Sequence, residues 1–241
     1  MLVATQPDLG TALVVAFTLV CLLVAAGIPM RYLLIGLGVG AGLVVIFAIM
    51  EPYRRARLTA FLNPWEHAST SGFQAVQGQI ALGSGGLTGV GVGESVQKAF
   101  YLPEAHTDFI LAVIGEELGV LGVSALLFLY GLLAYAGLRV AKAARGPYAA
   151  LLAAGITSLI LCQALLNTFA VLGLAPLTGV PLPFISYGSS NLVVLLVGMG
   201  LLLNVADGGR VPYKVVEGSR GARGHRSRGN SRARRAGAGG R

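Results

Sequence analysis

The sequence predicts an all-α fold, a polytopic membrane helical bundle with about five transmembrane helices and one large extracytoplasmic loop. Three observations lead to this class. Hydrophobic residues make up 55% of the 241 residues and charged residues only 12%, whereas a soluble domain carries about 25% charge. Long stretches without any charge cover most of the chain. No alternating strand pattern competes with them, and in lipid each helix satisfies its own backbone.

Each uncharged stretch is close to the length of about 20 residues that a helix needs to cross about 30 Å of hydrocarbon. The predicted spans cover residues 9–28, 33–50, 118–138, 148–173 and 185–206. Residues 1–206 therefore form the transmembrane part. A further helix, over residues 71–82, is mildly amphipathic and suits the membrane interface.

The charge distribution predicts the topology. Residues 207–241 hold ten Lys or Arg against two acids, a local charge of +8 that equals the net charge of the whole chain. This Gly-, Ser- and Arg-rich tail is predicted to be disordered and cytoplasmic, as are Arg139, Lys142 and Arg145. An odd number of spans then places residues 51–107 outside. A basic tail of this kind can bind nucleic acid, but contact with anionic lipid headgroups is the favoured interpretation.

Two parts of the outer loop invite a phosphate interpretation. Arg54 and Arg55 follow the second span and could pair with a pyrophosphate substrate or serve as interfacial anchors. The glycines of residues 83–93 lack the Lys-Ser/Thr pair and the preceding strand of a phosphate loop. These glycines therefore provide either backbone that approaches a substrate or a neighbouring helix closely, or simple flexibility.

Four carboxylates and one imidazole gather at the mouth of the third span, namely Glu104, His106, Asp108, Glu116 and Glu117. Charge at a membrane boundary is a functional-site hypothesis by default. Asp108 precedes an apolar helical run, so it is either a helix N-cap or a general base. Glu104 either raises the pKa of Asp108 by repulsion or is simply solvated.

Other polar positions favour supporting roles. Glu116 and Glu117 point about 100° apart on a helix, so one can face the bundle in a packing or ion-pair role, with any cationic partner expected outside this chain. Gln163 and Asn167 are spaced i, i+4 and favour interhelical hydrogen bonds over lining a lipid groove. The histidines stand without ligand spacing, so no metal site is predicted.

Six motifs occur in one order along residues 5–206. They are QPDLGT (6–11), NPWE (63–66), SVQK (95–98), YLPEAHTD (101–108), GEELG (115–119) and PFISYGSS (183–190). Together they resemble the SEDS proteins (shape, elongation, division and sporulation), and the FtsW-type division members more than the RodA-type members. A departure lies in residues 186–191, where the usual pattern has a second Gly.

SEDS proteins have about ten transmembrane helices, and the resemblance implies that this chain starts near the end of the fifth. The chain is therefore expected to be a fragment, or to have a start assigned too late, and to be inactive alone.

The resemblance implies a peptidoglycan glycosyltransferase that polymerises lipid II into glycan strands during septal cell wall synthesis. Asp108 matches the essential outer-loop aspartate of the family and would be the general base. The other expected substrate contacts are Glu104, Arg54, Arg55, Lys98, Ser186 and Ser189. No cofactor is implied apart from a possible divalent cation such as Mg²⁺. Expected partners are lipid II, a class B penicillin-binding protein and other division proteins, in the cytoplasmic membrane at the division septum. The alternative is a lipid II transporter (flippase) or a non-catalytic division scaffold.

Overall fold

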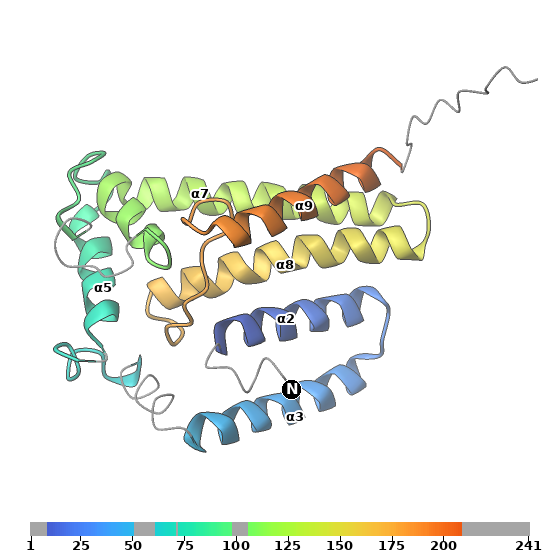
Figure 1. The fold of residues 1–241 in the computed structure, drawn as a ribbon, viewed down its shortest axis with the longest axis horizontal. Helices are drawn as coiled ribbons and strands as arrows, with labels where there is room; N and C mark the ends of the chain where they lie inside the picture. The colour runs from blue at the N-terminus through green and yellow to red at the C-terminus, as the bar shows by residue number, and fades with distance from the viewer. Residues whose placement is uncertain (1–8, 51–60, 71, 98–105, 209–241) are drawn as a thin grey trace, which may run out of the picture. The chain divides into compact units, whose positions relative to one another are not determined.

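The computed structural model describes residues 9–50, 61–70, 72–97 and 106–208 of the chain (Figure 1). The regular elements among these residues are all helices and none is a strand, which confirms the all-α prediction. The helices are α2 (Leu9–Ala25), α3 (Met30–Met50), α5 (Phe73–Gly85), α7 (Ile110–Ala143), α8 (Pro147–Val171) and α9 (Ser189–Ala206).

The apolar helices overlap the predicted spans, although α7 begins before its span and ends after it. Among the described residues, α7, α8 and α9 are long and apolar enough to cross a membrane, while Gly10–Ala25 and Met30–Gly40 are apolar but shorter. Length and composition thus give a multi-pass membrane protein. The number of five crossings stays a prediction.

Helix α8 lies at the centre of the bundle. It packs against α7, α2 and α9, and Figure 1 shows it between α7 and α2. Small residues permit these close approaches. The side chain of Thr157 occupies the space beside Gly137 of α7, and Leu22 of α2 packs on Gly155.

Helix α7 is broken at Gly119, where φ is 66° and ψ is −165°. A break leaves backbone N–H and C=O groups without partners in their own helix. The glycine loop, defined here as residues 86–91 after α5, supplies those partners. The four hydrogen bonds run from Val90 N to Glu116 O (2.9 Å), Gly91 N to Glu117 O (3.1 Å), Val120 N to Gly86 O (3.0 Å) and Leu121 N to Leu87 O (3.2 Å).

The break separates the part of α7 that carries Glu116 and Glu117 from the part that continues to Arg139. Helix α7 begins at Ile110, before the predicted span at residue 118, and Gly119 interrupts it. The glycine loop therefore approaches a neighbouring helix closely. A Cβ atom on Gly89, whose φ is 82°, would overlap the carbonyl oxygen of Glu117. Only glycine has this freedom.

The α8–α9 loop, residues 172–188, folds back onto the bundle. Leu182 is fully buried in the core with Val171 of α8 and Leu111 of α7. The hydroxyl of Tyr130 in α7 donates a hydrogen bond to the carbonyl of Pro183 at 2.6 Å. These contacts hold the loop beside the residues that precede α7.

Candidate functional site

Asp108 lies in the turn that leads into α7, at the end of the bundle covered by the α8–α9 loop. The N-cap of α7 is Phe109, whose side chain makes no capping hydrogen bond. Phe109 is buried against Gly78 of α5, where a Cβ atom would lie 2.7 Å from its ring. Asp108 therefore directly precedes the N-cap, and the packing of Phe109 holds the turn in place.

Asn167 of α8 ties Asp108 to the α8–α9 loop. Its side-chain nitrogen donates to the carbonyl of Asp108 at 2.8 Å and to the carbonyl of Val180 at 2.7 Å. Asn167 is 2% exposed. Because both bonds originate from one amide group, the backbone at Asp108 and the loop at Val180 are held in a set relation to each other.

A small polar cavity adjoins the Asp108 carboxylate. It has a volume of about 40 Å³, and Gln74, Asn167, Thr178 and Gly179 are among the residues that line it with Asp108. The side-chain oxygens of Asn167 and Thr178 are buried and have no hydrogen-bond partner in the described part of the chain. The cavity therefore offers room and unused hydrogen-bonding capacity for water-sized groups, since a water needs about 10–15 Å³.

Gly179 sets how closely the loop approaches the carboxylate. A Cβ atom there would lie 3.4 Å from one carboxylate oxygen of Asp108, and its φ of 69° strains any other residue. A sugar cannot enter a space of this size, because pockets for drug-sized ligands measure about 300–1,000 Å³. A sugar substrate would therefore reach the carboxylate from outside the cavity.

Ser186 and Tyr187 attach the far end of the same loop to the segment before Asp108. The Ser186 hydroxyl donates to the carbonyl of Thr107 at 2.5 Å and accepts from the backbone of Leu182 at 2.7 Å. The Tyr187 N–H donates to the carbonyl of His106 at 2.9 Å, and the two rings meet edge-on at 5.9 Å. The carbonyls of three successive residues, 106 to 108, thus each accept a hydrogen bond from α8 or from this loop.

Glu116 is buried in α7, with 3% exposure. Its carboxylate accepts hydrogen bonds from the Ser95 hydroxyl and from the backbone N–H groups of Val96 at 3.2 Å and Gln97 at 3.5 Å. The contacts that the structure describes for this carboxylate are hydrogen-bond donors of the same chain, and a cationic partner outside the chain stays a prediction. Glu116 therefore holds residues 95–97 against α7.

A family model described as cell cycle protein FtsW/RodA/SpoVE matches residues 1–210. The chain belongs to the FtsW/RodA/SpoVE family. This result confirms the resemblance that the motifs indicated.

Named relatives and solved structures of the FtsW/RodA/SpoVE family agree with this assignment. The chain is 46% identical over 207 residues to the probable peptidoglycan glycosyltransferase FtsW of Geobacter sulfurreducens, covering 86% of this chain and 55% of the relative. It is 44% identical over 210 residues to the stage V sporulation protein E of Bacillus subtilis, covering 86% and 56%. The chain thus spans about half the length of the curated relatives it matches.

Two solved structures of the family share the fold. A chain from a peptidoglycan synthase complex, described as coordinating polymerisation and crosslinking, superimposes with a TM-score of 0.68 at 33% identity, covering 87% of this chain and 59% of that chain. A mutant of the Thermus thermophilus rod shape determining protein RodA gives a TM-score of 0.57 at 31% identity, covering 87% and 54%.

Several predicted site residues of this family member lie outside the described residues. These are Arg54, Arg55, Lys98 and Glu104. Ser189 is exposed and begins α9, away from the hydrogen bonds of Ser186.

The remaining predicted supporting residues lie close to the break and the helix interfaces. Glu117 is half-buried, and its carbonyl meets the glycine loop. Gln163 donates to Asn191 of α9 at 3.0 Å, which is an interhelical hydrogen bond of the kind expected for this face. Among the described residues, no group of three or more His, Cys, Asp or Glu side chains could hold a metal ion.

Sequence reasoning missed Ser95, Gln74, Thr178 and Gly179 as neighbours of the site. Ser95 stands in one of the six motifs, and Gly179 lies in a loop whose prolines and glycine signal a turn between two spans. Neither signal says which distant residue the loop will contact.

Proposed function

We propose that this chain carries the reaction centre of a peptidoglycan glycosyltransferase that polymerises lipid II into glycan strands during division. The observation that carries the proposal is the Asp108 carboxylate beside Gly179, with its backbone held by Asn167. The named function of the curated relatives supports the same activity.

The proposed reaction joins an acceptor sugar hydroxyl to the anomeric carbon of a lipid-linked donor. The Asp108 carboxylate accepts the hydroxyl proton as the new carbon–oxygen bond forms. The bond between the anomeric carbon and the phosphate oxygen breaks, and undecaprenyl pyrophosphate leaves with both electrons. A neutral sugar hydroxyl is a weak nucleophile. A positioned base makes it a stronger one by taking its proton as the new bond forms.

The position of the base depends on the contacts described above. Asn167 and Ser186 bind the carbonyls of Asp108 and Thr107, and both belong to elements far from Asp108 in the sequence. Holding reacting groups in a productive orientation can supply about 7 kcal/mol of a barrier. These residues act through Asp108 and are positioning residues.

The charge on the leaving pyrophosphate needs a counter-charge, for which we propose Arg54, Arg55, Lys98 or a divalent cation such as Mg²⁺. Glu104, near Asp108 in the sequence, and Ser189 remain proposed substrate contacts. We further propose a class B penicillin-binding protein and other division proteins as partners, and the division septum as the location. The similarity to a chain of the peptidoglycan synthase complex, in which polymerisation and crosslinking are coordinated, supports a crosslinking partner.

Polymerisation of labelled lipid II tests the proposal, in a full-length protein that carries the N-terminal half present in the relatives. Asp108→Asn keeps the shape of the side chain and removes the base, so polymer should fall about 10²-fold to 10⁴-fold while the amount of folded protein is unchanged. Glu66→Gln makes the same chemical change at an exposed residue and should leave polymerisation intact.

Two outcomes would overturn the proposal. Normal polymer yield from Asp108→Asn would remove Asp108 from the mechanism. Movement of labelled lipid II across liposomes without any polymer would favour the transporter.

We also propose that residues 51–107 face outward, as the cytoplasmic assignment of the basic tail requires. Ser84 is exposed in α5, so Ser84→Cys should react with an impermeant thiol reagent in intact cells. Reaction only after lysis would reverse the orientation.

A further inference from the structure

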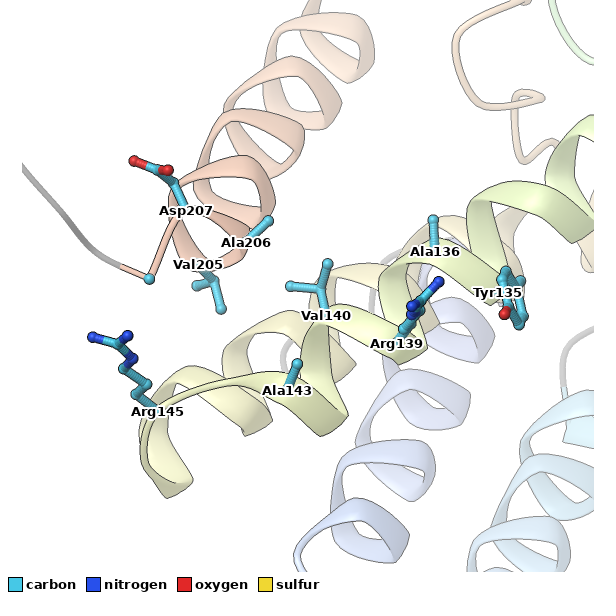
Figure 2. A pocket seen from close by; sticks show the side chains of 10 residues that line it. Tyr135, Ala136, Arg139, Val140, Ala143, Arg145, Val205, Ala206 and Asp207 are labelled. Carbon is cyan, nitrogen blue, oxygen red and sulfur yellow. The ribbon is translucent and has the colours of Figure 1, made fainter.

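A second cavity lies at the opposite end of the same helices. It has a volume of about 540 Å³ and opens between the last turns of α7 and α9 and the turn that leads into α8. Figure 2 shows it from close by. Its walls are formed by short apolar side chains, among them Val140, Ala143, Val205 and Ala206. These small residues leave the space open.

Charged side chains of both signs surround the cavity. Arg139 comes from α7, Arg145 from the turn before α8, and Asp207 from the C-cap of α9. All three are exposed. In Figure 2, Arg145 and Asp207 lie at one end of the cavity and Arg139 lies at the other end beside Tyr135. Arg145 adjoins the turn after Asp207, because its guanidinium is 3.9 Å from where a Cβ atom on Gly208 would be.

The position of the cavity corresponds to a membrane boundary. Helix α9 has 18 residues and ends at Ala206, so it spans about 27 Å, close to the hydrocarbon thickness. The apolar walls therefore meet the acyl region, and the charged rim meets the level of the phospholipid headgroups.

The electrostatics present both signs to a ligand. The cavity faces the C-terminal ends of α7 and α9, which carry the negative ends of the helix dipoles, while the N-terminal end of α8, close after Arg145, carries a positive end. Asp207 adds a full negative charge at the rim. A ligand with a phosphate and a nearby ammonium would match both signs. Guanidinium groups bind phosphate oxygens in a bidentate fashion, and a primary ammonium has three N–H donors for a carboxylate and for free carbonyls.

We propose that this cavity binds the headgroup of a zwitterionic phospholipid with a primary ammonium, of the phosphatidylethanolamine class. Arg145 binds the phosphate and Asp207 binds the ammonium. Arg139, at the other end, is available to the ester carbonyls of the glycerol. The volume suits such a ligand, since small-molecule sites measure about 300–1,000 Å³. The proposal does not depend on the glycosyltransferase proposal, because the two sites lie at opposite ends of α7 and α8.

Lipid retention by the 241-residue chain tests the proposal. The chain is reconstituted in nanodiscs with equal amounts of dioleoyl phosphatidylethanolamine, phosphatidylcholine and phosphatidylglycerol, extracted in mild detergent and analysed by native mass spectrometry. We expect phosphatidylethanolamine to be retained about tenfold over phosphatidylcholine, because the quaternary ammonium of choline cannot donate a hydrogen bond.

Three variants assign the contacts. Arg145→Gln should lower retention of phosphatidylethanolamine about tenfold through loss of the phosphate contact. Asp207→Asn should remove the preference for phosphatidylethanolamine over phosphatidylcholine. Arg31→Gln, in the first turn of α3 and outside the residues that line the cavity, is the matched control and should change nothing.

Two kinds of result would overturn the headgroup proposal. Preferred retention of phosphatidylglycerol, strengthened by Asp207→Asn, would show an anion site instead. Equal retention of the three lipids by all variants, or retention of none, would show that the cavity is not a headgroup site.

Discussion

The two ends of the α7–α8–α9 bundle differ in how they treat polar groups. At the Asp108 end, the cavity beside the carboxylate measures about 40 Å³, and Asn167 is buried and bound to two carbonyls. At the Arg145 end, the cavity measures about 540 Å³, and its charged side chains are exposed. One end holds its groups in place, and the other leaves them free to meet a ligand.

The difference follows from the backbone that each end must accommodate. The Asp108 end contains a broken helix and a long loop packed into the core, where a buried backbone group without a partner costs about 1–3 kcal/mol. Side chains and glycines from other segments therefore have to satisfy that backbone. The Arg145 end is a short turn at the membrane boundary, where water and lipid headgroups can form hydrogen bonds with the free backbone groups. The polar residues Gln163, Asn167 and Thr168 of α8 accordingly lie toward its Asp108 end.

The largest expected effect comes from one methyl group at the tightly packed end. A Cβ atom on Gly85 would overlap the carbonyl oxygen of Gly115, whereas Gly83, two residues earlier in α5, has nothing within 4 Å. Gly85→Ala should lower the free energy of unfolding by about 3 kcal/mol. Gly83→Ala should raise it by about 0.5–1 kcal/mol, because alanine is the better helix former.

Thermal unfolding of the purified chain in detergent measures both changes. Equal unfolding midpoints for the two glycine variants would contradict the close contact between α5 and α7.

The next effect concerns the amide that links α8 to Asp108. Asn167→Leu should cost about 2 kcal/mol of stability, because it leaves the part-buried carbonyl of Asp108 and the buried carbonyl of Val180 without this donor. Gln163→Leu, one turn earlier on the same face, removes a single bond to Asn191 and should cost about 1 kcal/mol. Chemical unfolding followed by tryptophan fluorescence of Trp65 compares them. A smaller loss for Asn167→Leu than for Gln163→Leu would count against the role of Asn167.

Removal of one tyrosine hydroxyl at each end compares how much a single hydroxyl contributes to stability there. Tyr130 donates to the carbonyl of Pro183 and is 8% exposed, whereas Tyr148, at the start of α8, is 79% exposed. Tyr130→Phe should cost about 1 kcal/mol, and Tyr148→Phe less than about 0.5 kcal/mol. The midpoint of thermal unfolding reports both, and equal losses would contradict the difference between the ends.

The smallest expected change in stability belongs to Arg145. Because its side chain is exposed beside an open cavity, Arg145→Gln should alter the free energy of unfolding by less than about 0.5 kcal/mol. The same variant should retain about tenfold less phosphatidylethanolamine, as proposed above. A large loss of stability would instead make Arg145 a structural residue of the turn.

The sequence by itself determined the class of the fold and the chemistry worth searching for. Uncharged stretches place the apolar helices, since in lipid each helix must satisfy its backbone locally and local composition is then sufficient. Charge near a membrane boundary singled out Asp108 and Glu116, and the i, i+4 spacing put Gln163 and Asn167 on one face.

Only the tertiary structure decided which of these residues meet. The break at Gly119 depends on the glycine loop, which lies well before it in the chain, to bind the groups it frees. Asn167 finds its two acceptors 59 and 13 residues away. Such contacts depend on the path of the whole chain, because a hydrogen bond between distant segments leaves no periodic signal in either one. The sequence therefore locates the polar groups, and the packing of the helices and loops assigns their partners.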